Sequence, residues 1–350
     1  MEACALTFSI RPAIREKIGL LFGVAGPSGS GKTLTALMLA TGMAGKEGVI
    51  GFIDTEAGRA LHYAPRAGET ADPARHTFGF LHLDFPPPFT PERYVEAIRE
   101  CEKAGATVNV VDSVTHEWLG EGGCSDIQEQ EARRMATNRE TGEVDPWRIE
   151  AVTAPAWKRP KLLHQRMMAR LIQTRSHVIF CMRAQEKIKI VKKASGKGTE
   201  IVPIGFQPLC EKNFLYELSG SMMLRPDKPG CPDYALPHKL NADLQQIFPD
   251  GSLIGMEAGE RLRQWAEGGT ERATLDKAAI GVRDLIERIQ DADHAGLKVI
   301  TGDAQVIKQR AWLAENRPEL AKRVDDAVTD ALALMDTAAP GGDGDLGQEA

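Results

Sequence analysis

The sequence lacks the features that would place the protein among membrane, secreted or disulfide-stapled proteins. No apolar run approaches the roughly 20 residues that a membrane-spanning helix needs. Residues 1–17 lack the positive-then-apolar order of a secretion signal. The six cysteines are scattered and include no C-x-x-C pair, so the sequence signals neither a zinc site nor a disulfide framework. We therefore expect a cytoplasmic protein with reduced thiols and no membrane partner.

Neither sign of charge dominates the chain. Of its 350 residues, 42% are hydrophobic and 26% are charged, and the formal net charge is −6. These values are typical of soluble globular proteins, and the length suits one large or two modest domains. A negative net charge argues against a protein that coats nucleic acid over its whole surface, but it is compatible with a local basic patch.

Short apolar runs alternate with longer helical stretches over residues 18–250, which predicts an α/β fold with a parallel sheet. Most of the runs are continuous rather than alternating, as in strands covered by helices on both faces. The predicted strands are residues 18–25, 49–53, 80–83, 108–111 and 178–182, and the predicted helices are residues 32–43, 91–104 and 160–174. We assign residues 1–267 to this core domain.

The pattern changes after the core. Residues 268–270 contain two glycines and predict a linker, and residues 271–337 show only helical periodicity. We expect a small helical appendage there. Residues 338–350 are acidic and glycine-containing and carry no basic residue, which predicts a disordered tail. Two roles stay open for this tail, which either competes with DNA for a basic segment or keeps the chain soluble.

One segment matches the phosphate-binding pattern G-x-x-x-x-G-K-[ST]. It follows an apolar strand and opens a helix, which is the context the pattern requires. The glycines allow a tight turn whose N–H groups reach phosphate oxygens, and the helix dipole adds positive potential. The lysine reaches the β- and γ-phosphates, and the threonine hydroxyl suits Mg²⁺. The residues of the segment are Gly26, Pro27, Ser28, Gly29, Ser30, Gly31, Lys32 and Thr33.

Two acids lie where strands of the predicted sheet end. Asp112 ends the strand VNVVD and is a candidate for holding Mg²⁺ beside Thr33, although many strands end in Asp without such a role. Glu56 follows the strand in FIDTE, and Asp54 in the same segment suits a local cap or a partner that supports the site residues from behind. Because parallel strands end at one edge, Glu56 is predicted to lie beside the γ-phosphate and to activate water. The alternative is a solvated strand-end acid.

The segments GPSGSGKT, FIDTE, VNVVDS and HVIFCM, in this order, resemble the core of RecA-like P-loop ATPases. The likeness spans roughly residues 10–250 and is strongest to phage-encoded RecA-like ATPases that act with single-strand annealing and single-strand-binding proteins. It implies a three-layer core with a mostly parallel sheet, ATP and Mg²⁺ as cofactors, and a role in DNA recombination or annealing. It also implies that Glu56 is the catalytic glutamate, that Asp112 is the second acid on the Mg²⁺ side, and that the protein forms homo-oligomers.

The resemblance further implies a γ-phosphate sensor at the end of the strand 178–182, followed by a loop that contacts single-stranded DNA. Either Arg183 or Gln185 fits the sensor, and the choice stays open. We place the candidates for DNA contact in two expected loops, residues 119–157, a long excursion from the sheet that is predicted to be partly helical, and residues 184–207. The second is rich in lysine and glycine and suits a phosphate backbone, with a solvated charged hairpin as the alternative. Its candidate lysines are Lys187, Lys189, Lys192, Lys193 and Lys197.

Three functions fit these residues. The first is an ATPase stimulated by single-stranded DNA, which the FIDTE acid and the lysine-rich segment favour. The second is a small-molecule phosphotransferase, in which Arg133 and Arg134 would belong to a lid but Glu56 has no evident role. The third is a nucleotide-gated adaptor with little turnover. The partners expected under the first function are single-stranded DNA and a single-strand-binding or annealing protein.

Overall fold

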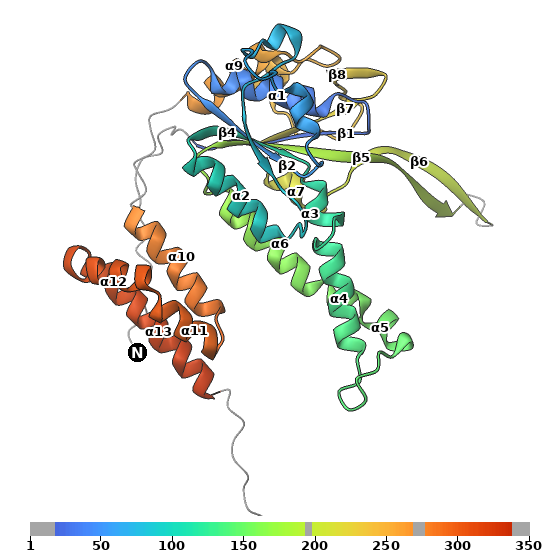
Figure 1. The fold of residues 1–350 in the computed structure, drawn as a ribbon. Helices are drawn as coiled ribbons and strands as arrows, with labels where there is room; N and C mark the ends of the chain where they lie inside the picture. The colour runs from blue at the N-terminus through green and yellow to red at the C-terminus, as the bar shows by residue number, and fades with distance from the viewer. Residues whose placement is uncertain (1–17, 193–197, 269–276, 338–350) are drawn as a thin grey trace, which may run out of the picture. The chain divides into compact units, whose positions relative to one another are not determined.

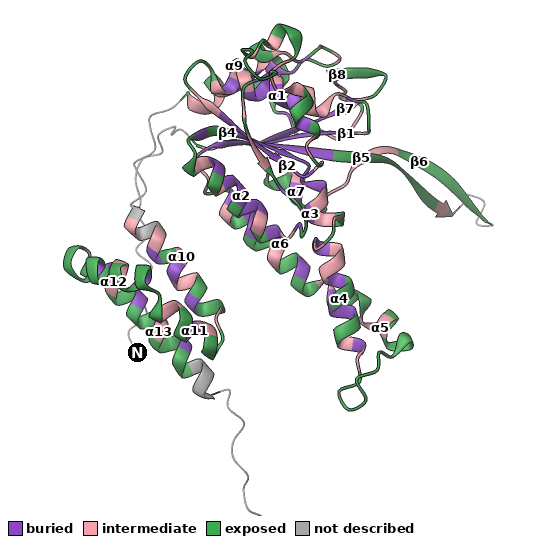
Figure 2. Cartoon of the chain, in the orientation of Figure 1, coloured by how far each residue is buried: buried purple, intermediate pink, exposed green. Residues whose placement is uncertain are grey.

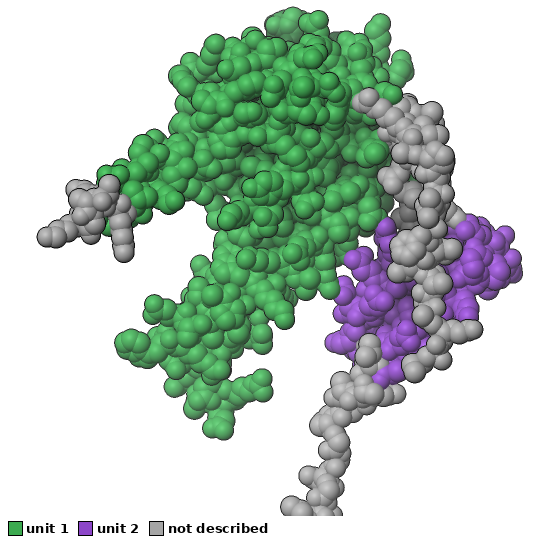
Figure 3. Space-filling model, turned by 180° about the vertical axis from the view of Figure 1, so that it is seen from behind, with its two compact units in different colours: residues 1–270 green, residues 271–350 purple. Residues whose placement is uncertain are grey.

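The computed structural model describes residues 18–192, 198–268 and 277–337 of the chain. Two compact units are present, residues 1–270 and residues 271–350 (Figure 3). The boundary between the two units falls directly after residues 268–270, the predicted linker. The predicted acidic tail, residues 338–350, lies outside the described residues.

The first unit is built on one eight-stranded sheet in the order β3-β2-β4-β5-β1-β7-β8, with β6 paired to β5. The pairings from β3 to β7 are parallel, whereas β6 and β8 run antiparallel to their neighbours. The predicted α/β fold with a mostly parallel sheet is therefore confirmed. The strands are β1 (Leu21–Gly26), β2 (Val49–Asp54), β3 (Leu81–Asp84), β4 (Ala106–Asp112), β5 (His177–Lys192), β6 (Thr199–Pro208), β7 (Gly220–Arg225) and β8 (Lys228–Pro232).

Helices cover both faces of the sheet, so the core has the three predicted layers (Figure 1). In β1, Phe22 and Val24 pack with α1, α8 and α9, and Leu21 and Ala25 pack in the cluster of α2 and α6. This alternation buries both faces of a continuous apolar run (Figure 2). The helices of this unit are α1 (Lys32–Ala44), α2 (Pro91–Lys103), α3 (Thr115–Leu119), α4 (Cys124–Ala136), α5 (Pro146–Ala156), α6 (Lys158–Leu171), α7 (Phe214–Glu217), α8 (Ala242–Ile247) and α9 (Met256–Glu267), with 3₁₀ turns at Arg59–Tyr63 and Pro73–Arg75.

Glycines let α1 and α9 lie close together. A Cβ atom on Gly42 would lie 1.9 Å from the backbone oxygen of Met256, and one on Gly259 would lie 2.2 Å from that of Leu39. Real Cβ atoms do not approach backbone oxygens so closely, so any larger residue would force the two helices apart. The contact fixes α1, which begins at the glycine-rich turn, closely against α9.

Two segments project from the core (Figure 1), and the second differs from the loop predicted from the sequence. Residues 119–157 contain the helices α4 and α5, in agreement with the predicted partly helical excursion. Residues 184–207 form most of a β-hairpin, because β5 continues past Met182 to Lys192 and pairs with β6. The prediction of a flexible loop there is therefore wrong, and the charged hairpin that was the alternative is present. The physical reason is that lysine and isoleucine alternate over residues 187–190 and the β-branched Val191 follows, a pattern that favours an extended strand.

The second unit is a small bundle with its own apolar core. Val282, Leu285, Ile289, Val324 and Ala327 are among its buried residues. The last helix begins at Pro318, and proline suits the first helical turn because its missing N–H would have no partner there. Its helices are α10 (Lys277–Asp291), α11 (His294–Gly302), α12 (Ala304–Asn316) and α13 (Pro318–Thr337). Across the described residues of both units, no helix combines the length and the apolar character needed to cross a bilayer.

Candidate active site

The predicted phosphate-binding segment forms the turn between β1 and α1. Gly29 and Gly31 have φ angles of 80° and 81°, a left-handed conformation that glycine adopts without steric cost. Gly31 is also the N-cap residue of α1, so the free N–H groups of the first helical turn face the same side as the glycine-rich turn. The Lys32 ammonium donates a hydrogen bond of 2.9 Å to the carbonyl oxygen of Pro27, and burial lowers the pKa of Lys32. The turn therefore carries donors for an anion.

Asp112 lies at the end of β4 and faces this turn. The Thr33 hydroxyl donates a hydrogen bond of 2.6 Å to Asp112 Oδ2. Asp112 is buried, and this burial raises its pKa to about 6; the Thr33 hydrogen bond opposes the shift and the nearby charge of Glu56 adds to it. The positive charge of Lys32 also opposes the shift, but the desolvation of the carboxylate outweighs it. Together with the threonine hydroxyl, the carboxylate forms an oxygen donor pair of the type that a hard divalent cation prefers.

Glu56 extends from the segment after β2, and its side chain is 12% exposed. Arg183 on β5 holds Glu56 Oε1 with two hydrogen bonds, from Nε at 2.9 Å and from Nη2 at 2.5 Å. Arg59 donates to Glu56 Oε2 at 3.3 Å, and His116 Nε2 lies 3.9 Å from Oε1. The carboxylate is thus oriented by two guanidinium groups, with an imidazole nearby, rather than solvated at a strand end.

Asp54 shapes the turn that carries Glu56. Its two carboxylate oxygens accept hydrogen bonds from the backbone N–H groups of Glu56, at 2.7 Å, and Ala60, at 3.2 Å. His82 Nε2 lies 3.1 Å from Asp54 Oδ2. The prediction that Asp54 is a local cap is confirmed, and its consequence is that the backbone of Glu56 has a fixed position.

These elements surround one cavity of about 420 Å³. The structure brings together Lys32, Glu56 and Asp112, which come from three separate segments of the chain, and adds Arg183 from a fourth. Their catalytic and binding roles stay predictions. The residues that line the cavity are Ser28, Lys32, Thr33, Asp54, Glu56, Arg59, Ala60, Asp112, Arg183, Ala184 and Leu209.

The two sensor candidates occupy different positions. Arg183 lines the cavity and contacts Glu56, whereas Gln185 is exposed further along β5, opposite Gln207, and is not among the lining residues. The candidate lysines lie further still from the cavity on the hairpin. Lys187 and Lys189 are exposed on β5 and Lys192 is its last residue, while Lys193 and Lys197 lie outside the described residues.

Three residues at the site were not predicted from the sequence: His116, Thr55 and Arg59. The Thr55 hydroxyl lies 2.7 Å from His116 Nδ1 and accepts a hydrogen bond of 2.7 Å from the N–H of Ser113. The His116 ring stacks on Phe89 with ring centroids 5.0 Å apart, and burial lowers its pKa, so the neutral form is favoured. This network joins the ends of β2 and β4. Its only sequence signal is the position of Thr55 and His116 shortly after two strand ends.

A glycine-rich turn at a helix N-terminus, facing a threonine–aspartate pair and an oriented glutamate at the carboxyl edge of a parallel sheet, defines a P-loop ATPase-type domain. The model of a family described as "AAA domain" matches residues 19–209, and the chain belongs to this family. Membership indicates a nucleotide-binding ATPase. Among curated proteins, no sequence matches this chain.

Proposed function

We propose that this protein is a Mg²⁺-dependent, RecA-like ATP hydrolase that single-stranded DNA stimulates and that acts in DNA recombination or annealing. The observation that carries the hydrolase assignment is the convergence of Lys32, Asp112, Glu56 and Arg183 on one cavity beside the N-terminus of α1. A bound triphosphate would meet helix N–H groups, an ammonium and a guanidinium there, which together offset its negative charge.

Each of the polar residues at the cavity has a separate role in the proposed hydrolysis. Lys32 would leave the carbonyl oxygen of Pro27 and bind the β- and γ-phosphates. Thr33 and Asp112 would hold Mg²⁺, since their side-chain oxygens lie 2.6 Å apart and are the hard donors that this ion prefers. The ion would supply charge neutralisation of the phosphate oxygens. Glu56 would orient the attacking water and accept its proton.

Arg183 links the cavity to the β5–β6 hairpin. In this structure its guanidinium donates two hydrogen bonds to Glu56 Oε1. A γ-phosphate would compete for the same guanidinium, which would release the carboxylate toward water. Because Arg183 and Gln185 lie on the same strand and only Arg183 lines the cavity, Arg183 is the better candidate for the sensor.

The DNA role is supported by the two projecting segments. The hairpin exposes Lys187 and Lys189, and the other projection exposes Trp147, whose relative exposure is 88%, next to Arg148. Cations and an aromatic ring are the groups that single-stranded nucleic acid binds through phosphate and base stacking. Homo-oligomers and a single-strand-binding or annealing protein belong to the same proposal, on the resemblance alone.

One assay tests these roles. Phosphate release from ATP is measured with Mg²⁺, with and without single-stranded DNA, and after chelation of the metal. We expect turnover that needs Mg²⁺ and rises with DNA, and we expect Lys32→Ala to abolish nucleotide binding. Turnover stimulated by a small phosphate acceptor instead of DNA would indicate the phosphotransferase. Nucleotide binding without turnover under any condition would indicate the adaptor and would refute the hydrolase assignment.

A further inference from the structure

Thr55 lies between the ends of β2 and β4, next to both acids of the candidate active site. It directly precedes Glu56 in the chain. Its backbone N–H donates a hydrogen bond of 2.8 Å to the carbonyl oxygen of Asp112, and its hydroxyl accepts one of 2.7 Å from the N–H of Ser113. One residue therefore connects the segment that carries Glu56 to the segment that carries Asp112.

The hydroxyl of Thr55 continues the connection where the sheet stops. The register between β2 and β4 ends at the pair formed by Asp54 and Asp112, so the bond to Ser113 lies beyond the last paired residues. Thr55 and Ser113 are both buried, and a buried N–H without an acceptor is costly. The hydroxyl also lies 3.2 Å from the carbonyl oxygen of Ser113. A valine of the same shape would keep the backbone bond to Asp112 but would remove the acceptor for Ser113.

His116 supports the same hydroxyl. Its Nδ1 lies 2.7 Å from Thr55 Oγ1, and its ring stacks on Phe89. The other ring nitrogen, Nε2, lies 3.9 Å from Glu56 Oε1. The contact with Thr55 forms whichever ring nitrogen carries the proton, because a hydroxyl both donates and accepts. His116 therefore fixes the Thr55 side chain and bounds one side of the space around the Glu56 carboxylate.

The Glu56 carboxylate needs this support when its strongest partner leaves. Arg183 donates two hydrogen bonds to Glu56 in this structure, but the proposed hydrolysis gives that guanidinium to the γ-phosphate. Arg59, whose side chain is 76% exposed, is a weak partner, because exposed ion pairs contribute little. The position of the carboxylate then depends on the backbone of Glu56, which is held by Asp54 and by the neighbouring Thr55.

We propose that Thr55 is a positioning residue for ATP hydrolysis and that His116 supports it. The inference rests on the proposed hydrolase function. Thr55 sets the distance between the base, Glu56, and the acid on the Mg²⁺ side, Asp112, by joining the chain next to each of them. It does not line the cavity of the candidate active site, so it acts through these two residues rather than on the substrate.

Two substitutions of Thr55 separate its hydroxyl from its shape. Hydrolysis by the full-length protein is measured in single turnovers with Mg²⁺ and single-stranded DNA, beside the dissociation constant for ATP. Thr55→Val should slow hydrolysis about 10- to 100-fold, because a small displacement of a reacting group has this effect, and should change the dissociation constant by less than about twofold. Thr55→Ser keeps the acceptor for Ser113 and should hydrolyse ATP within about threefold of the wild-type rate.

Thr174→Val is the matched control for the lost hydroxyl. The Thr174 hydroxyl donates a hydrogen bond of 2.7 Å to the carbonyl oxygen of Leu171. Thr174 precedes β5, which begins at His177, so it lies at the edge of the sheet opposite the strand ends that carry the acids. Thr174→Val should hydrolyse ATP at the wild-type rate.

A double variant distinguishes positioning from a general loss of stability. If Thr55 acts through Glu56, adding Thr55→Val to Glu56→Gln should not slow the residual reaction further, because the base that Thr55 positions is already absent. If the hydroxyl only stabilised the fold, the two losses of rate would multiply.

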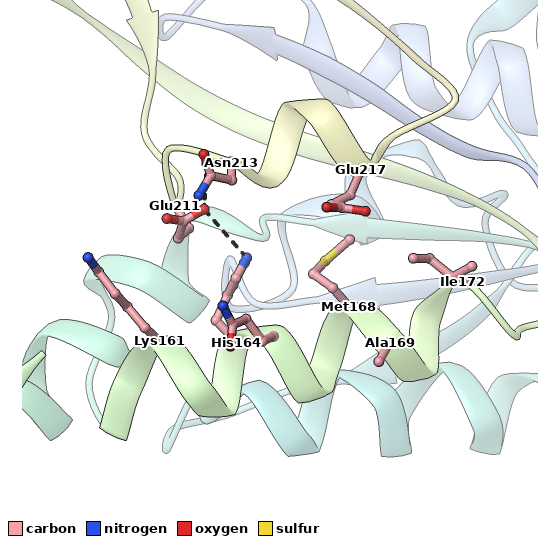
Figure 4. Close-up of a pocket in the computed structure, with 9 residues that line it drawn as sticks. Lys161, His164, Met168, Ala169, Ile172, Glu211, Asn213 and Glu217 are labelled. Carbon is pink, nitrogen blue, oxygen red and sulfur yellow. Dashed lines mark hydrogen bonds and ion pairs between the residues drawn. The ribbon is translucent and has the colours of Figure 1, made fainter. Parts of the chain in front are cut away.

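His116 gives an independent test that does not depend on the folding of Thr55→Val. His116→Asn keeps a polar group for the Thr55 hydroxyl and His116→Leu does not, so the leucine variant should be at least about threefold slower. His164→Leu is the control for a lost imidazole. The His164 side chain is 6% exposed and its Nε2 lies 3.8 Å from Glu211 Oε2, at a different cavity (Figure 4). His164→Leu should lower stability and keep the wild-type rate of hydrolysis.

The role of Thr55 is overturned if Thr55→Val hydrolyses ATP within about twofold of the wild-type rate, or if it slows Glu56→Gln by a further factor of about ten. If Thr55→Val does not fold, equal rates for the two His116 variants overturn it. Wild-type protein that binds ATP without turnover refutes the proposed hydrolase and this role with it. Wild-type turnover that Thr55→Val retains overturns the role of Thr55 alone.

Discussion

The substitution Glu56→Gln gives the sharpest test of the active site. It keeps the shape of the side chain but removes the charge that Arg183 and Arg59 pair with. The cavity is lined by three cationic side chains and three carboxylates, and the variant leaves three cations facing two carboxylates. We therefore expect the variant to retain nucleotide and to bind it more tightly. An uncompensated charge several ångströms from the phosphates is worth about 1 kcal/mol, or roughly fivefold in affinity.

Turnover should change in the opposite direction. Loss of a general base typically costs about 10²–10⁴-fold in rate, because the amide cannot accept the proton of water. Folding should change little, since the Arg183 side chain is 45% exposed and such ion pairs contribute about 0–1 kcal/mol.

The assay is single-turnover ATP hydrolysis beside equilibrium nucleotide binding. Asp84→Asn is the matched control, because Asp84 pairs in register with Asp54 at the end of β3 but does not line the cavity. Hydrolysis by Glu56→Gln at the wild-type rate would refute the role assigned to Glu56. Loss of nucleotide binding would show that the carboxylate supports binding rather than catalysis.

Three further predictions concern packing, pH and DNA. Gly259→Ala should lower the free energy of unfolding by about 2 kcal/mol in denaturant titrations, because the new methyl group meets a backbone oxygen of α1, whereas exposed Gly79→Ala should change it by less than about 0.5 kcal/mol. Hydrogen bonds from two arginines lower the pKa of Glu131 below its usual 4.5, so the stability it contributes is complete above pH 4.5 and is lost as the pH falls below that value. Glu131→Gln should therefore destabilise the protein at neutral pH and match the wild type in acid; equal stability at neutral pH would contradict this. Replacing Lys187 and Lys189 by glutamate should weaken single-stranded DNA binding and reduce the salt slope by about 1.4, and an unchanged slope would move the contact elsewhere.

Local patterns in the sequence predicted the parts of the fold that local chemistry controls. The turn at residues 26–33 was predictable because its glycine spacing and following helix are sufficient to form it. The continuous apolar runs predicted a sheet covered on both faces, and β1, β2, β4 and the start of β5 lie where expected. By contrast, β7 and β8 were not predicted, because each is short and contains glycine, which leaves no clear period.

The β5–β6 hairpin shows how composition can conceal a period. Its lysines and glycines suggested a loop, yet lysines and isoleucines alternate along β5, and Ile190 pairs in register with Ile201 on β6. Alternation of this kind is the signal of a strand even when half of its positions are charged.

The sequence by itself determined that the chain has a phosphate-binding turn, two acids at strand ends and a separate helical unit, because each depends on residues adjacent in the chain. Only the tertiary structure decided that Arg183 rather than Gln185 lines the cavity beside the N-terminus of α1 and holds Glu56. It also decided that His164 lies between Glu117 and Glu211. These contacts join segments that lie far apart in the chain, and their distances depend on how the strands twist and the helices pack, which no local pattern encodes.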